Sequence, residues 1–109
     1  MSRVRAFAND NLRFDVADEG PEDGEVVVLL HGFPQRHTSW RDVAPRLHEA
    51  GYRTLAPDLR GYSPGARPKG RRAYSLDKQV GDVKALVDAV GGPVHMVGHD
   101  WGGAYAWAF

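Results

Sequence analysis

The fold is decided by one stretch of the chain, Val94-His95-Met96-Val97-Gly98-His99-Asp100-Trp101-Gly102-Gly103. Its first four residues are mostly apolar and predict a short strand over residues 94–97. The glycine-rich turn that follows leads into the alanine-rich residues 104–108, which favour a helix. The stretch therefore predicts a strand that turns sharply into a helix, with Asp100 in the turn.

Strand and helix patterns alternate upstream of this stretch. The apolar run at residues 26–30 is typical of a strand buried on both faces of a parallel sheet. Residues 3–8 and 12–17 predict an antiparallel hairpin around a polar turn at residues 9–11. The other predicted elements are a strand over residues 52–56 and helices over residues 40–50 and 76–90. We expect an α/β fold, in one domain over residues 1–109, with a mostly parallel sheet and an antiparallel N-terminal hairpin.

Composition narrows the classes of partner. The 109 residues include 14 Lys and Arg against 14 Asp and Glu, so no net charge favours nucleic acid or an anionic membrane. The absence of cysteine excludes disulfides and thiolate metal sites. No apolar run approaches the ~20 residues of a membrane helix, and residues 1–10 do not resemble a signal peptide. We therefore expect a cytoplasmic protein.

Asp100 places a carboxylate in the turn, at a position from which such a turn can expose a nucleophile to a substrate. In a nucleophile elbow, small residues two positions before and after the nucleophile let the backbone pass, and Gly98 and Gly102 occupy those positions. An aspartate can attack a saturated carbon and form an alkyl-enzyme ester. Hydrolysis of that ester needs amide donors for an oxyanion, and the amide of Trp101 begins a helix. The alternative is that Asp100 only caps the helix.

Two motifs together resemble the aspartate-nucleophile branch of the α/β-hydrolase superfamily: His31-Gly32-Phe33-Pro34 and Gly98-His99-Asp100-Trp101-Gly102-Gly103. The segment Asp58-Leu59-Arg60-Gly61-Tyr62 also looks like the loop after the family's fourth strand. The resemblance implies that Asp100 is the nucleophile and that the oxyanion hole consists of the backbone amides of Phe33 and Trp101. It also implies a geometric role, in shaping the loop and the elbow, for His31, Gly32, Pro34, Gly98, Gly102 and Gly103.

Within this branch, the phenylalanine at position 33 favours a resemblance to the epoxide hydrolases, because haloalkane dehalogenases more often carry Asn or Glu at this position. Haloacetate dehalogenases usually carry Arg where this chain has Trp101. The resemblance therefore implies an enzyme that opens epoxides to vicinal diols, with a haloalkane dehalogenase as the alternative. A non-catalytic binding module is a third possibility.

The expected partners are a small, apolar epoxide or halogenated substrate and water, with no cofactor and no metal. The basic residues 67–72 read as a solvated loop and not as a nucleic-acid contact. The resemblance places the general-base histidine, the catalytic acid and the cap tyrosines downstream of the elbow. We therefore expect an incomplete domain, inactive alone and poorly soluble because its last strand is an open edge. The sequence leaves the oligomeric state open.

Overall fold

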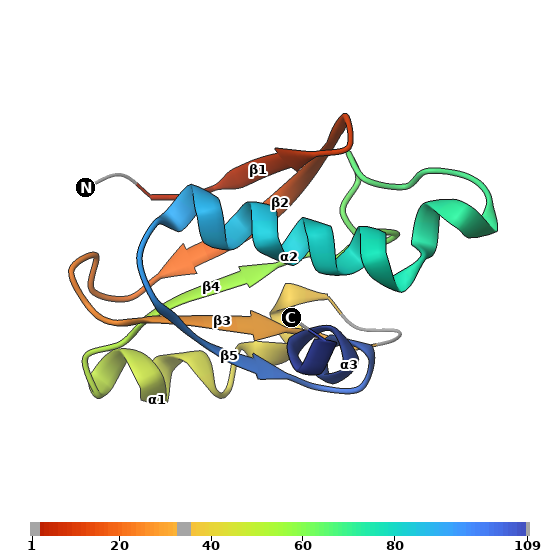
Figure 1. Cartoon of the computed structure of the whole chain (residues 1–109). Coiled ribbons are helices and arrows are strands. Elements are labelled where there is room, and N and C mark those ends of the chain that lie inside the picture. Colours follow the sequence, from red (N-terminus) through yellow and green to blue (C-terminus); the bar gives the residue numbers. More distant parts are fainter. Residues whose placement is uncertain (1–2, 33–35, 109) are drawn as a thin grey trace.

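The computed structural model describes residues 3–32 and 36–108 of the chain. Within these residues the strands form a five-stranded sheet in the order β1-β2-β4-β3-β5 (Figure 1). The strands are β1 (Ala6–Asn9), β2 (Leu12–Glu19), β3 (Val26–Leu30), β4 (Arg53–Pro57) and β5 (Val94–Gly98). The α-helices are α1 (Ala44–Glu49), α2 (Leu76–Val90) and α3 (Trp101–Ala108), with short 3-10 helices η1 (His37–Trp40) and η2 (Arg71–Tyr74). The predicted α/β fold with an N-terminal antiparallel hairpin is confirmed.

The central strand β3 pairs in parallel with both of its neighbours. Val28 lies opposite Leu55 of β4, and Leu30 lies opposite Gly98 of β5. Because the carboxyl ends of these three parallel strands meet at one edge of the sheet, the segments that follow them lie close together. Those segments begin at His31, Asp58 and His99.

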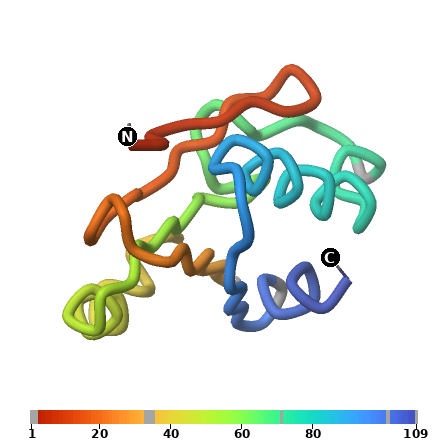
Figure 2. Tube along the Cα trace, turned by 60° about the vertical axis from the view of Figure 1, so that its left-hand side comes forward, coloured from red at the N-terminus to blue at the C-terminus, as the bar shows by residue number. Residues whose placement is uncertain are grey.

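Helices cover both faces of the sheet. Val28 and Leu30 of β3 point toward α2 and α3, in one buried cluster with Leu86 of α2. The alternate residues Val27 and Leu29 pack on the other face against Ala44 of α1. Figure 2 shows α1 on one side of the strands and α2 with α3 on the other. This two-sided burial explains why β3 is apolar at every position.

The hairpin and the long helix formed as predicted. The turn between β1 and β2 places Asp10 and Asn11 at φ 54° and 61°, the left-handed conformation that two-residue hairpin turns require. Helix α2 spans Leu76–Val90, and the side chain of Ser75 accepts a hydrogen bond from the Lys78 amide at 3.4 Å.

The prediction of a helix over residues 40–50 is wrong for residues 40–43. Pro45 has no amide hydrogen to donate to the carbonyl one turn earlier, so it is accepted only in the first turn of a helix. Helix α1 accordingly begins at Ala44, and the shorter η1 precedes it. Val43, which lies just before α1, is 42% exposed.

Strand β5 forms one edge of the sheet, and apolar groups are exposed near it. Val97 is 43% exposed and Trp107 of α3 is 94% exposed. No helix in the part of the chain that the structure describes is long and apolar enough to cross a membrane.

Candidate active site

Asp100 lies in the turn between β5 and α3 with a left-handed backbone, φ 58°. Aspartate is one of the few non-glycine residues that adopt this conformation. Backbone hydrogen bonds fix the turn, because the His99 amide donates to the Leu30 carbonyl at 3.0 Å and the Gly102 amide donates to the His99 carbonyl at 3.0 Å. The side chain of Asp100 is exposed, as a nucleophile must be.

The glycines two residues before and after Asp100 are required by close backbone contacts. A Cβ added to Gly98 would lie 2.5 Å from the carbonyl carbon of Gly102. A Cβ added to Gly102 would lie 2.5 Å from the carbonyl oxygen of His31. Gly103 is different, because a Cβ there would have its nearest neighbour at 3.6 Å, an ordinary contact. The geometry therefore explains Gly98 and Gly102 and leaves room for a side chain at Gly103.

Gly32, which follows β3, lies against Asp100. A Cβ added to Gly32 would overlap the Cβ of Asp100 and lie 3.0 Å from its Oδ2 atom. The two motifs of the sequence, far apart along the chain, are thus brought into direct contact. Phe33 and Pro34 lie outside the residues that the structure describes, so the proposed amide donor at Phe33 stays a prediction.

Trp101 is the first residue of α3. An amide at this position has no acceptor one turn earlier in the helix, and the helix dipole favours negative charge in front of it. The backbone of Trp101 therefore suits the role of anion donor that the sequence predicts for it.

His31 is fully buried and holds the start of the segment after β3. Its Nε2 atom accepts a hydrogen bond from the Leu59 amide at 3.0 Å, so the proton is on Nδ1, which donates to the Gly32 carbonyl at 3.1 Å. Burial lowers the pKa of His31, and this outweighs the hydrogen bond to Gly32 and the charge of Asp58, which raise it. His31 is thus a neutral structural residue with both ring nitrogens engaged.

A cavity of about 500 Å³ opens beside His31 and Gly32, at the start of the segment after β3. Its walls combine His31 and Gly32 with aromatic, aliphatic and polar side chains, namely Leu59, Arg60, Tyr62, Tyr74, Leu76, Gln79 and Tyr105, together with Gly61. The pKa of Tyr62 is raised by burial and then by the charge of Asp100. Burial, with smaller contributions that include Asp100, raises the pKa of Tyr105 to about 12. The cavity has the size and mainly apolar lining of a small-molecule site.

The family to which known proteins with similar sequences belong is consistent with the strand-to-helix turn around Asp100. A family model described as alpha/beta hydrolase fold matches residues 25–109. The chain belongs to the α/β-hydrolase fold family.

The relatives of this α/β-hydrolase chain include several epoxide hydrolases. Epoxide hydrolase B of Mycobacterium tuberculosis is 46% identical over 96 residues, which cover 86% of this chain and 27% of that protein. Epoxide hydrolase 4 of Mus musculus is 38% identical over 100 residues, which cover 91% and 28%. The crystal structure of epoxide hydrolase VrEH1 from Vigna radiata matches with a TM-score of 0.89 and 41% identity, and the match covers 95% of this chain and 32% of that one. The chain thus spans about a quarter to a third of the length of these relatives.

The other histidines of this α/β-hydrolase chain do not form a second site. His37 contacts Asp58, His48 contacts Thr54 at 2.8 Å and His95 lies 3.5 Å from Glu25. His99 is exposed at the end of β5. Among residues 3–32 and 36–108, no three His, Asp or Glu side chains gather so that they could hold a metal ion.

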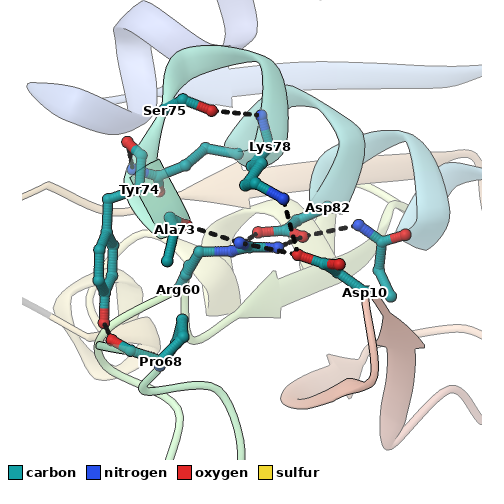
Figure 3. A network of polar contacts seen from close by, with 10 residues as sticks. Asp10, Arg60, Pro68, Ala73, Tyr74, Ser75, Lys78 and Asp82 are labelled. Carbon is teal, nitrogen blue, oxygen red and sulfur yellow. Dashed lines mark hydrogen bonds and ion pairs between the residues drawn. The ribbon is translucent and has the colours of Figure 1, made fainter. Parts of the chain in front are cut away.

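Sequence reasoning missed the role of Arg60, a residue of the cavity wall whose side chain is fully buried. Its guanidinium donates twice to Asp82 of α2, at 2.7 and 2.8 Å, and once to the Ala73 carbonyl at 2.6 Å (Figure 3). It also lies 3.3 Å from Asp10 in the hairpin turn. The network ties the loop after β4 to α2 and to the hairpin, which stiffens one wall of the cavity. An arginine in a loop gives no signal of this burial, because its partners are distant in sequence.

Asp58, the last residue before that loop, was also missed as a separate residue. Its buried carboxylate accepts hydrogen bonds from residues 36 and 37, directly after the segment that follows β3. The available signal was its position, since it directly follows a strand of the parallel sheet.

Proposed function

We propose that the protein containing this chain hydrolyses small apolar epoxides to vicinal diols, with Asp100 as the nucleophile. The observation that carries the proposal is the contact between Gly32 and an exposed aspartate in a glycine-flanked strand-to-helix turn. The names of the relatives support the choice of epoxides, and the apolar walls of the neighbouring cavity suit such substrates.

The proposed reaction has two steps. In the first, an Asp100 oxygen attacks a ring carbon, the ring carbon–oxygen bond breaks, and the ring oxygen takes a proton from an acid outside this chain. In the second, a base outside this chain takes a proton from water as the water oxygen attacks the ester carbonyl and an oxyanion forms. The oxyanion collapses, the bond between the carbonyl carbon and the alkoxide oxygen breaks, the alkoxide takes up the proton of the new carboxyl group to leave as the diol, and the carboxylate is restored; the proton on the base returns through solvent to the acid that opened the ring. The amide of Trp101, and that of Phe33 in this proposal, stabilise the oxyanion.

The 109-residue chain alone is inactive in this proposal. Family resemblance places the general base and the ring-opening acids downstream of the elbow, and four of the five histidines in the chain already make contacts elsewhere. The remaining strands and the cap would complete the domain. Strand β5, now at the sheet edge, is where further strands would pair.

The test compares the full-length protein with its Asp100→Asn variant on styrene oxide and on a primary bromoalkane. Asparagine tolerates the left-handed backbone but lacks the nucleophilic carboxylate. We expect diol formation by the wild type and a loss of at least about 10³-fold in the variant. Exposed Asp42, changed to Asn, is the matched control and should keep full activity.

Two other results would redirect the proposal. Halide release from the bromoalkane without diol formation would make the protein a haloalkane dehalogenase of the same branch. Undiminished diol formation by Asp100→Asn would remove the aspartate mechanism altogether.

A further inference from the structure

Two segments of the chain form most of the cavity wall. The loop after β4 contributes Leu59, Gly61 and Tyr62, and η2 with the first turn of α2 contributes Tyr74, Leu76 and Gln79. The segments meet at Gly61, where an added Cβ would lie 3.1 Å from Cε1 of Tyr74. The shape of the cavity therefore depends on how these two segments are held relative to each other.

Arg60 joins the two segments. It belongs to the loop after β4, its side chain is fully buried, and its guanidinium reaches the other segment at two points (Figure 3). Nε and Nη2 donate to the two carboxylate oxygens of Asp82 in α2, at 2.8 and 2.7 Å. Nη1 donates at 2.6 Å to the carbonyl oxygen of Ala73, which belongs to the peptide group that joins Ala73 to Tyr74. Arg60 thus fixes both α2 and the backbone at Tyr74 relative to the loop.

Each segment is also ordered by bonds of its own. In the loop, the Gly61 amide donates to the Ala66 carbonyl at 2.7 Å. In the other segment, the hydroxyl of Tyr74 donates to the Pro68 carbonyl at 2.7 Å, so the Tyr74 ring is held at its hydroxyl as well as at its backbone (Figure 3). Because each segment is ordered in this way, weaker bonds from Arg60 should shift one segment against the other.

The lining of the cavity suits a flat apolar group. It includes three aromatic residues, Tyr62, Tyr74 and Tyr105. Aromatic side chains bury a large area against a flat ring and add a favourable stacked or edge-on contact. Gly32 lines the same cavity and lies against Asp100, so an epoxide held at Asp100 has this lining beside it.

We propose that Arg60 determines specificity for epoxides with an aryl substituent, by holding the loop after β4 and the start of α2 at the spacing that an aromatic ring fills. The inference rests on the proposed function, because it names the class of epoxide and assigns the cavity to its substituent. The side chain of Arg60 is fully buried and acts through the residues that line the cavity. Arg60 is therefore a positioning residue and not a catalytic one.

The test uses the full-length protein with Arg60→Lys and measures kcat and KM for styrene oxide and for 1,2-epoxybutane. Lysine keeps the charge but replaces the planar fork with a single ammonium, so it cannot reproduce the bonds to both oxygens of Asp82 and to the Ala73 carbonyl. The phenyl group of styrene oxide buries more surface against the cavity wall than the ethyl group of 1,2-epoxybutane does. We expect the ratio of kcat/KM for styrene oxide to that for 1,2-epoxybutane to fall about tenfold, mainly through KM for styrene oxide.

Arg53→Lys is the matched control. Arg53 is also buried, and its Nε and Nη2 donate to the two carboxylate oxygens of Asp18, but it begins β4 at the end opposite to the cavity. The control should destabilise the fold through the same loss of a two-bond contact, without changing the ratio of the two kcat/KM values.

Asp82→Asn weakens the same link from its other side. The oxygen of asparagine can keep the bonds that Oδ1 accepts from Nη2 of Arg60 and from Nδ2 of Asn9, while the bond from Nε of Arg60 is lost. We expect the ratio to fall in the same direction by a smaller factor, about threefold.

The outcomes separate this inference from the proposed function. If the wild type opens neither epoxide, both fail. If the wild type is active and Arg60→Lys changes the ratio no more than Arg53→Lys does, the role of Arg60 is overturned and the proposed function stands. If Arg60→Lys does not fold, Asp82→Asn decides in the same way. If neither variant folds, Arg60 serves the fold as a whole and its role in specificity is overturned.

Discussion

Gly32 and Asp100 are in contact although 68 positions of the chain separate their numbers, and no side chain fits between them. The contact exists because β3 and β5 are parallel neighbours, with Leu30 opposite Gly98. Each strand therefore delivers its following turn to the same edge of the sheet. The candidate active site is the meeting of these two turns.

Gly32→Ala should disable the site. The new methyl group would overlap the Asp100 side chain, and this overpacking should cost about 1–3 kcal/mol of unfolding free energy. We expect a large loss of diol formation in steady-state assays of the full-length protein.

The control for this substitution is Gly81→Ala in the middle of α2. A Cβ there would lie 3.7 Å from the nearest atom, Asn9 Nδ2, and alanine is the better helix former by about 0.5–1 kcal/mol. Denaturant titration should show Gly81→Ala to be neutral or more stable. Normal activity of Gly32→Ala would mean that the contact with Asp100 is relaxed in solution.

The two glycines after Trp101 should respond differently to alanine. At Gly102, in the first turn of α3, the added carbon would lie 2.5 Å from the backbone carbonyl oxygen of His31 at the end of the central strand β3, so we expect a loss of about 3 kcal/mol. At Gly103 the nearest atom is 3.6 Å away, and alanine in a helix should cost nothing. Thermal unfolding of the two variants side by side measures the difference; equal destabilisation would refute the geometric explanation of the turn.

Much of this arrangement could be predicted from residue patterns. The apolar run of β3 and the capped pattern of α2 depend on local residues, so their positions were predicted closely. The turn with Asp100 was predicted because glycines at fixed positions are a local requirement of that backbone. The start of α1 was predicted wrongly, because one proline outweighed a helical apolar pattern.

The contacts that support the site could not be predicted in this way. The bonds from Asp58 to residues 36 and 37, and from Arg60 to Asp82, join residues about twenty positions apart whose pairing depends on how strands and helices pack. A charged residue in a loop is normally solvated, so its sequence favours exposure even where the fold buries it.

His31 should make the protein less stable in mild acid. Its folded pKa lies below the ordinary value of 6.5, so the unfolded chain binds the proton more readily. The stabilisation that comes from neutral His31 is therefore fully present above about pH 6.5. It falls as the pH drops toward the pKa of His31 in the folded protein, by at most about 1.4 kcal/mol per pH unit for one proton.

Glutamine at position 31 offers the comparison for this effect. Its amide oxygen can accept the Leu59 amide but cannot be protonated in this range. The unfolding free energy of His31→Gln, measured from pH 8 to pH 5, should fall less steeply than that of the wild type. Parallel curves would show that His31 does not need to be neutral in the folded protein.

An isotope measurement tests directly whether Asp100 becomes covalently bound to the substrate carbon, as we propose. The full-length protein is mixed with less than one equivalent of styrene oxide in water enriched in heavy oxygen. The masses of the diol and of the peptide that contains Asp100 are then measured by mass spectrometry. We expect an unlabelled diol and heavy oxygen in the Asp100 carboxylate, because in the proposed reaction water attacks the ester carbonyl and the diol carries away an original carboxylate oxygen. Heavy oxygen in the diol, with none in Asp100, would show that water attacks the epoxide directly and would contradict the account.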